Sequence, residues 1–298
     1  MNVRKAVITA AGWGTRFLPA TKALPKETIP LVDKPVIQYV VEEAVASGIE
    51  QVIIVTAIGK RAIEDHFDRA FELEHTLEQK GDTQLLEQVR RISELAKVYY
   101  VRQKEQLGLG HAVLVAAELV GDEPFAVMLP DDVIDGETPC LKQMLDVYER
   151  YNSSVIAVQR VQPEETKSYG IIEPRQVDGR TYQILDMVEK PRPGEAPSNL
   201  AIVGRYVLTP DIFKMLRQTK RGSGGEIQLT DGLRLLLEHQ KIYGHEFTGT
   251  RYDTGNPLGF LRASVELALK RPDIGPEFLR YLQGLDLGAL LAGSKASS

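Results

Sequence analysis

Residues 5–30 read "KAVITAAGWGTRFLPATKALPKETIP", in which the apolar run 5–10 leads directly into a loop containing Gly12 and Gly14. An unbroken, β-branched run of this kind is typical of a buried strand. Glycines directly after a strand allow backbone N–H groups to turn inward and bind phosphate oxygens. The stretch therefore predicts a strand followed by an anion-binding loop.

This loop matches neither of the two best-known phosphate-loop patterns. The G-x-G-x-x-G pattern needs a third small residue where Phe17 stands, and the next strand-like run, 51–57, ends without the acid that would bind a ribose. The G-x-x-x-x-G-K-[ST] pattern is absent. Arg16, Lys22 and Lys26 add positive charge to the same loop. A surface salt bridge would explain a lone arginine, but the glycines and lysines around Arg16 favour an anion site.

The runs 51–57, 98–102 and 125–129 resemble the first strand and alternate with helical patterns. This alternation predicts an α/β fold with a Rossmann-like, doubly wound sheet of buried parallel strands. Ligands are expected beyond the carboxyl ends of those strands. From residue 151 the pattern becomes β-rich, and helical patterns return at 226–239 and 256–270.

We expect a single domain over 1–298, with a first half at 1–150 and a second, β-rich half with C-terminal helices at 151–298. Residues 61–97 form a charged helical insertion in the first half, broken once at Gly81-Asp82. Its simplest interpretation is a solvated helical pair that packs one apolar edge, Phe67, Phe71 and Leu77. An oligomer contact is the alternative, and makes a homo-oligomer (a dimer or a tetramer) our expectation.

Composition excludes several classes of function. The 298 residues carry 41 acidic and 36 basic side chains, a net charge of −5, which argues against general nucleic-acid binding. No apolar run reaches membrane-spanning length, so we expect no membrane partner. Cys140 is the only cysteine, which rules out a disulfide framework. A cytoplasmic protein is the expectation.

Three further motifs place polar side chains after strand-like runs. Asp131 and Asp132, in "LPDD", follow the run 125–129, and a carboxylate pair there indicates Mg²⁺, although a turn or N-cap aspartate is the alternative. Asp253 follows a second strand-like segment and precedes a helical pattern. Gln103, in "QKEQLGLG", follows the run 98–102 and offers both a hydrogen-bond donor and an acceptor to a ligand, and a surface amide is the alternative.

The stretch 10–35, "AAGWGTRFLPATKALPKETIPLVDKP", strongly resembles the signature of sugar-nucleotide pyrophosphorylases, which is G-x-G-T-R followed by P-K. The segment 63–81 is similar to one found in the bacterial uridylyltransferases of that family, which the related thymidylyltransferases lack. The resemblance extends to about residue 270. Trp13 and Thr28 stand where the family more often has leucine and methionine.

The resemblance implies a mixed, GT-A-like sheet with a β-rich sugar-binding portion, and a reaction in which UTP and α-D-glucose 1-phosphate give UDP-glucose and pyrophosphate with Mg²⁺ as cofactor. It implies catalytic roles for Arg16, Lys26, Asp131 and Lys190, and metal ligation by Asp131 and Asp253. It implies nucleotide contacts from Ala10, Ala11, Gly12, Gly14, Glu27, Gln103 and Gly108. It implies sugar-phosphate contacts from Asp132, Gly170, Glu189, Lys190, Asn199, Val203 and Glu226.

The same residues bear on other possible functions. The same chemistry with TTP, or with another sugar phosphate, is the alternative within enzymes. A non-catalytic sensor of sugar nucleotides is expected to have lost the loop Arg or Lys or a metal aspartate, and all of these are present. A nicotinamide oxidoreductase is excluded by Phe17 and by the missing ribose acid.

Overall fold

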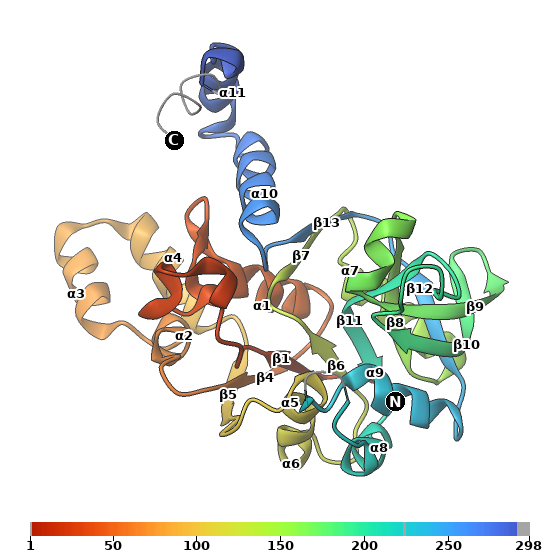
Figure 1. Ribbon diagram of the computed structural model, residues 1–298. Coiled ribbons are helices and arrows are strands. Elements are labelled where there is room, and N and C mark those ends of the chain that lie inside the picture. The colour runs from red at the N-terminus through yellow and green to blue at the C-terminus, as the bar shows by residue number, and fades with distance from the viewer. Residues whose placement is uncertain (1, 223–224, 291–298) are drawn as a thin grey trace.

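A nine-stranded mixed sheet forms the centre of the computed structural model, which describes residues 2–222 and 225–290 (Figure 1). Its strands lie in the order β5-β4-β1-β6-β11-β8-β12-β10-β9. Their bounds are β1 Lys5–Thr9, β4 Gln51–Thr56, β5 Lys97–Arg102, β6 Phe125–Met128, β8 Val155–Arg160, β9 Gly170–Asp178, β10 Thr181–Glu189, β11 Leu200–Leu208 and β12 Ile242–Glu246. Two small sheets pair β2 (Pro30–Leu31) with β3 (Lys34–Pro35), and β7 (Asp132–Asp135) with β13 (Thr250–Asp253).

Strands β5, β4, β1 and β6 are parallel neighbours, as the apolar runs predict. Their carboxyl ends therefore meet at one edge of the sheet, with the glycine loop after β1 and Asp131 after β6. The mixed α/β class is confirmed. The expectation that every run is a buried strand is wrong for β5. It is an edge strand that pairs only with β4, and Tyr99 is 43% exposed.

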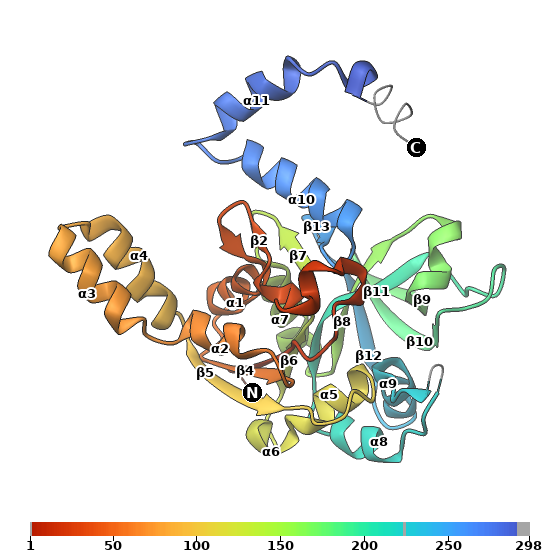
Figure 2. The same ribbon diagram turned by 60° about the vertical axis from the view of Figure 1, so that its left-hand side comes forward.

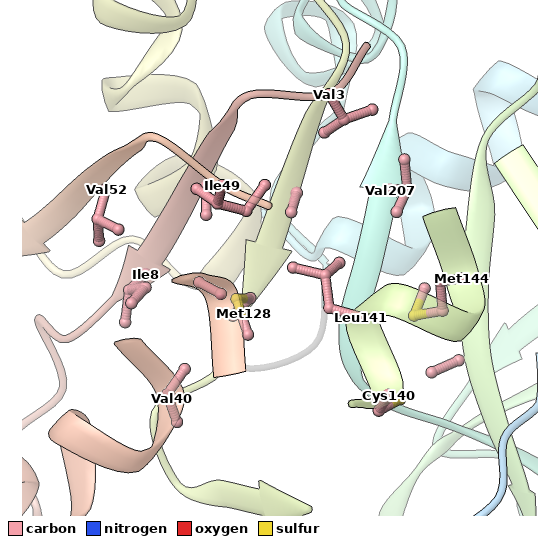
Figure 3. Close-up of a cluster of buried hydrophobic side chains, with 14 of the residues drawn as sticks. Val3, Ile8, Val40, Ile49, Val52, Met128, Cys140, Leu141, Met144 and Val207 are labelled. Carbon is pink, nitrogen blue, oxygen red and sulfur yellow. The ribbon is translucent and has the colours of Figure 1, made fainter. Parts of the chain in front are cut away.

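Helices cover both faces of the sheet, because neighbouring residues of a strand point to opposite faces. Ile8 belongs to a core beneath α1 and α7, whereas Val7 belongs to a second core beneath α5, α8 and α9. Figure 3 shows part of the first core, including Ile8 of β1, Val40 of α1 and Leu141 of α7. The α-helices are α1 Val36–Ala46, α2 Arg61–Phe67, α3 Phe71–Lys80, α4 Thr83–Ser93, α5 Leu109–Val115, α6 Ala117–Val120, α7 Cys140–Tyr151, α8 Ile212–Gln218, α9 Leu229–Leu237, α10 Pro257–Leu269 and α11 Gly275–Gln283. The 3₁₀ turns are η1 Thr15–Phe17, η2 Ala20–Lys22, η3 Lys26–Thr28 and η4 Pro163–Ser168.

The insertion 61–97 folds into α2, α3 and α4, which extend to one side of the sheet (Figures 1 and 2). The break at Gly81-Asp82 is confirmed, because Gly81 ends α3 with a φ of 71° and Asp82 caps α4. Phe67 and Leu77 are buried as expected. Phe71 is not, because it begins α3 with its ring stacked on His75 at the surface, 72% exposed.

The chain ends in an arm of two helices, α10 and α11, that rises away from the sheet (Figures 1 and 2). Asn256 caps α10 by accepting a hydrogen bond from the Gly259 N–H at 2.9 Å. The sequence patterns predict α10 but not α11. Among the helices that the structure describes, none has the length and apolar character needed to cross a bilayer.

Candidate active site

The glycine loop after β1 uses its two glycines for different purposes. A side chain at Gly12 would meet no atom within 4 Å, so this position faces open space. Gly14 adopts a φ of 69°, and a Cβ there would lie 3.1 Å from the Cβ of Lys26. The first glycine thus leaves room for a ligand, and the second lets the chain turn back onto the lysine.

A cavity of about 440 Å³ opens beside Gly12 at the carboxyl ends of β1 and β5. Gln106 closes one side of it, since its Nε2 donates to the carbonyl of Ala11 at 2.7 Å. Ala10 lies behind the cavity and donates its N–H to the Val55 carbonyl at 2.8 Å. The cavity is lined by Thr9, Ala11, Gly12, Trp13, Gln103, Gln106, Gly108, Leu109, Ala112 and Glu226.

The cavity brings Gln103 and Gly108 together, as the sequence predicts, and local packing gives a second reason for the glycine. Gln103 is buried and donates from Nε2 to the Gly108 carbonyl at 3.3 Å. A Cβ at Gly108 would lie 2.7 Å from the Cβ of Glu226 and 2.9 Å from the carbonyl of Ile227. Packing against this neighbouring segment therefore requires the glycine. Glu226, expected at the sugar, lies in this cavity beside Gln103.

Lys26 and Asp131 join the loop after β1 to the loop after β6. The Nζ of Lys26 lies 2.6 Å from Oδ2 of Asp131, and the two side chains are 19% and 31% exposed. Burial lowers the pKa of Lys26, but the Asp131 and Glu27 carboxylates more than offset this and raise it. Burial likewise raises the pKa of Asp131, and Lys26 brings it below its usual value. Both groups are therefore charged at neutral pH.

Asp253 is far from Asp131 in the sequence but lies near it in the fold. A Cβ at Gly255 would lie 2.8 Å from Oδ2 of Asp131 and 3.0 Å from Oδ1 of Asp253, so the two carboxylates flank this glycine. Thr254 fixes the approach, because its N–H and its hydroxyl each donate to the Asp131 carbonyl at 2.8 Å. Arg16 is exposed, and its guanidinium donates to the Gly255 carbonyl at 3.4 Å.

Two carboxylates are a donor set that fits Mg²⁺, which keeps several waters and takes few protein ligands. No cluster of three or more His, Cys, Asp or Glu side chains suited to a metal occurs within residues 2–222 and 225–290. Asp131 and Asp253 are therefore suited to a metal that arrives with a phosphate ligand, rather than to an all-protein cage.

Asp132 points away from its neighbour Asp131 into the protein. Its Oδ1 accepts from the Nε of Arg251 at 2.7 Å, and its Oδ2 accepts from the Gly204 N–H at 2.7 Å. Arg251 also donates to the Tyr169 hydroxyl at 3.3 Å. Both carboxylate oxygens of Asp132 are thus engaged within the protein, and the expected contact with the sugar phosphate stays a prediction.

Arg205 anchors the loop after β6 through hydrogen bonds to its backbone. This arginine is fully buried in β11 and pairs with Glu43 of α1, with NH2 2.7 Å from Oε2. Its guanidinium also donates to the carbonyls of Leu129 and Asp132, at 3.1 and 2.6 Å. These two carbonyls flank Asp131, so Arg205 fixes the turn that presents this carboxylate.

The residues expected at the sugar form a more open group along β9 and β10. A Cβ at Gly170 would lie 3.1 Å from Oε2 of Glu189, and that oxygen accepts from the Thr230 hydroxyl at 2.7 Å. Lys190 has a φ of 46°, unusual for a residue with a side chain, and its N–H donates to the Tyr169 carbonyl. Its side chain is 54% exposed, with Nζ 3.5 Å from Oε1 of Glu189.

Two other predicted sugar contacts, Asn199 and Val203, have different surroundings from each other. Asn199 is exposed, and its side chain accepts a hydrogen bond from Arg160 at 3.3 Å. Val203 is 3% exposed and packs in the core beneath α1 and α7. Neither side chain contacts Gly170 or Glu189 through a hydrogen bond, and their roles stay predictions.

Glu27 is buried in the η3 turn, where its Oε2 lies 2.6 Å from the Nζ of Lys60. The residue lines neither the cavity beside Gly12 nor the sugar group, so the nucleotide contact expected of it stays a prediction. Lys60 follows β4 at the same sheet edge that carries the other loops.

Sequence reasoning missed three buried basic residues, each of which had a signal. Arg251 is two residues before Asp253, so both side chains lie on one face of β13. Arg205 is a charge inside the otherwise apolar run "LAIVGRYVL", which predicts a buried partner. Lys60 lies in the short loop after the parallel strand β4, and loops at this end of parallel strands often carry ligand-binding groups.

Comparison with known proteins agrees with this geometry. The family model described as nucleotidyl transferase matches residues 5–270. UTP–glucose-1-phosphate uridylyltransferase of Bacillus subtilis strain 168 is 56% identical over 284 residues, which cover 95% of this chain and 97% of the relative. The enzyme named UTP–glucose-1-phosphate uridylyltransferase 2, of Staphylococcus saprophyticus, is 54% identical over 96% of this chain and 99% of the relative.

Solved structures give the same result. The UTP-bound UGPase from Acinetobacter baumannii matches with a TM-score of 0.90 and 43% identity, over 96% of this chain and all of that one. A UDP-glucose pyrophosphorylase complexed with UDP-glucose matches with a TM-score of 0.83 and 45% identity, over 91% of this chain and all of that one. The resemblance found in residues 10–35 is therefore confirmed, and the chain belongs to the nucleotidyl transferase family.

Proposed function

We propose that this protein transfers a uridylyl group from UTP to α-D-glucose 1-phosphate, giving UDP-glucose and pyrophosphate. The observation that carries the proposal is the meeting of Gly12, Lys26 and Asp131 at one sheet edge, with Asp253 beside them. Relatives that are 53–56% identical over nearly their whole length and are named for this reaction support the choice of substrates.

The reaction needs little proton transfer. A phosphate oxygen of glucose 1-phosphate is already ionised at neutral pH, so it attacks the α-phosphorus of UTP without a general base, and the bond to the leaving pyrophosphate breaks. Catalysis then depends on alignment and on stabilising negative charge. Arg16 and Lys26 neutralise the β- and γ-phosphates and the departing pyrophosphate. Lys190 binds the incoming sugar phosphate.

Mg²⁺ is the proposed cofactor, held by Asp131 and Asp253. When bound, it supplies positive charge that polarises the α-phosphate and offsets charge on the leaving group. In the structure described here Lys26 occupies Oδ2 of Asp131. We expect this ammonium to turn toward the phosphates when UTP binds, since it then gains an anionic partner within reach of the same loop.

The nucleotide and sugar contacts complete the proposal. The uracil ring enters the cavity of about 440 Å³, where Gln103 and the backbone near Ala11, Gly12 and Gly108 face it. Glu189 accepts hydrogen bonds from sugar hydroxyls, and Gly170 allows the backbone to lie close to the ring. The fold is interpreted as the GT-A-like variety of Rossmann-like sheet, in which both substrates bind at the carboxyl ends of parallel strands.

Pyrophosphate release tests the proposal directly. Glucose 1-phosphate and Mg²⁺ are mixed with UTP, TTP, CTP, ATP or GTP in turn, and product sugar nucleotides are identified by mass. We expect release with UTP and formation of UDP-glucose. No release with UTP would contradict the proposal. Equal release with UTP and TTP would show that the protein also transfers a thymidylyl group, which is the alternative given above. UDP-glucose binding without any turnover would indicate a sensor.

We also propose that the protein is a cytoplasmic homo-oligomer, a dimer or a tetramer. Exposed apolar residues on the helices outside the sheet support an assembly, namely Phe71, Leu73, Leu85, Leu279 and Tyr281. Light scattering during size-exclusion chromatography measures the mass in solution. A single 33.1 kDa species across a hundredfold range of concentration would contradict it.

A further inference from the structure

Lys60 and Glu27 form an ion pair that is buried more deeply than any contact between the substrate-facing groups. The side chains of Lys60 and Glu27 are 8% and 1% exposed. Lysine and glutamate are rarely buried to this extent, and a buried pair adds little net stability compared with apolar side chains of similar volume. Stability alone therefore gives no sufficient reason for this pair.

The Lys60–Glu27 pair adjoins the Lys26–Asp131 pair. Glu27 follows Lys26 in the η3 turn, so their side chains leave adjacent backbone positions. Positive and negative groups alternate through Lys60, Glu27, Lys26 and Asp131, with 2.6 Å within each of the two bonded pairs. Glu27 acts electrostatically on both lysines, since its charge raises the pKa of Lys26 and opposes the lowering of the Lys60 pKa by burial.

The Glu27 carboxylate depends on Lys60 for its side-chain partner. Within the part of the chain that the structure describes, Oε1 of Glu27 is buried and accepts no hydrogen bond, while Oε2 accepts from Lys60. Without Lys60, this buried anion would have Lys26 as its nearest countercharge. Glu27 would then compete with Asp131, and with any bound phosphate, for the same ammonium.

We propose that Lys60 is a positioning residue for nucleotidyl transfer, which neutralises Glu27 so that the ammonium of Lys26 stays directed at Asp131 and the UTP phosphates. This role rests on the proposed function of the site. It deepens that function, because Lys60 acts on the orientation of Lys26 and contacts neither Asp131 nor the sugar group.

Three variants separate this role from a purely structural one. In Lys60→Met, kcat/KM for UTP is expected to fall roughly tenfold to hundredfold, the effect of a catalytic group misplaced by about 1 Å, while KM for glucose 1-phosphate is unchanged. Lys60→Arg is expected to recover most of the activity, because a guanidinium can still bind Glu27. Adding Glu27→Gln to Lys60→Met removes the competing charge and is expected to restore kcat/KM for UTP toward the wild-type value.

Lys34→Met is the matched control. Lys34 also pairs with a glutamate, Glu42, at 2.6 Å, but this pair is about one-third exposed and lies between β3 and α1, apart from the glycine loop. The Lys34→Met variant should leave kcat/KM for UTP and KM for glucose 1-phosphate unchanged. Thermal unfolding of every variant shows which of them fold.

Two results would overturn the role of Lys60. One is a folded Lys60→Met variant with wild-type kcat/KM for UTP. The other is a folded double variant as impaired as Lys60→Met. If Lys60→Met does not fold, the double variant, which leaves no buried charge unpaired, is compared with wild type instead, and a kcat/KM for UTP lower by roughly tenfold or more overturns the role. A wild-type protein without UTP-dependent turnover would instead contradict the proposed function, so the two failures are distinguishable.

Discussion

The end of the site proposed to bind the UTP phosphates (the phosphate end) and the end proposed to bind the sugar (the sugar end) differ in how firmly their charged groups are held. At the phosphate end, Lys26 is bonded to Asp131, and Asp132 has both oxygens engaged by Arg251 and Gly204. At the sugar end, the Lys190 side chain is 54% exposed, with its ammonium 3.5 Å from Glu189. We infer that the end where charge develops is preorganised, whereas the end that accepts the second substrate remains open to solvent.

The largest effect is expected where the two ends join, at Arg251. Arg251→Met leaves the Asp132 carboxylate buried without its guanidinium, which costs about 3–5 kcal/mol of stability. Urea unfolding of the two proteins measures this difference. Arg251→Met combined with Asp132→Asn should recover much of the loss, because no buried charge is then unpaired. Equal stability of Arg251→Met and wild type would show that the contact between Arg251 and Asp132 does not stabilise the phosphate end.

Asp131→Ala tests the phosphate end by itself. Loss of one preorganised charged group is expected to lower kcat by roughly 10²–10³-fold, by analogy with oxyanion-hole donors. Pyrophosphate release at saturating UTP, glucose 1-phosphate and Mg²⁺ provides the measurement. Near wild-type turnover would remove Asp131 from the mechanism, and with it the distinction between the two ends.

Lys190→Ala tests the sugar end. An exposed lysine that binds the sugar phosphate is expected to contribute one charge-assisted hydrogen bond, so kcat/KM for glucose 1-phosphate should fall roughly tenfold to hundredfold. Most of this change should be in KM, and KM for UTP should stay the same. A larger loss of kcat than in Asp131→Ala would reverse the comparison, because the open end would then be the more important for the chemical step.

The smallest effect is expected from pH. Lys26 holds the pKa of Asp131 below its usual value of 3.8, so the contribution of this charge to stability is complete above that value and is lost as pH falls through the lowered folded pKa. The difference in unfolding free energy between wild type and Asp131→Asn should therefore stay constant from pH 7 to about pH 5. If this difference already shrinks between pH 7 and about pH 5, the Asp131 carboxylate is not fully ionised in the folded protein before substrate binds.

Much of the phosphate end can be predicted from local sequence, and less of the sugar end. The strand before Gly12 and the aspartates after β6 follow from short apolar runs and from the rule that parallel strands bind ligands at their carboxyl ends. Glu226, expected at the sugar, lines the cavity beside Gly12, and its contact with the sugar stays a prediction. Glu189 and Lys190 rested on resemblance alone, because an exposed Glu–Lys pair carries no signal of its own.

The sequence by itself determined the parallel strands, the turn at Gly14 and the placement of Asp131 at a strand end. These depend on backbone propensity and on the spacing of apolar residues, which are local properties. Only the tertiary structure decided that Lys26 meets Asp131 across 105 residues, that Asp253 joins them and that Lys60 is buried against Glu27. These contacts depend on the order of the strands in the sheet and on the conformation of each loop at the sheet edge. The local spacing of apolar residues specifies neither of them.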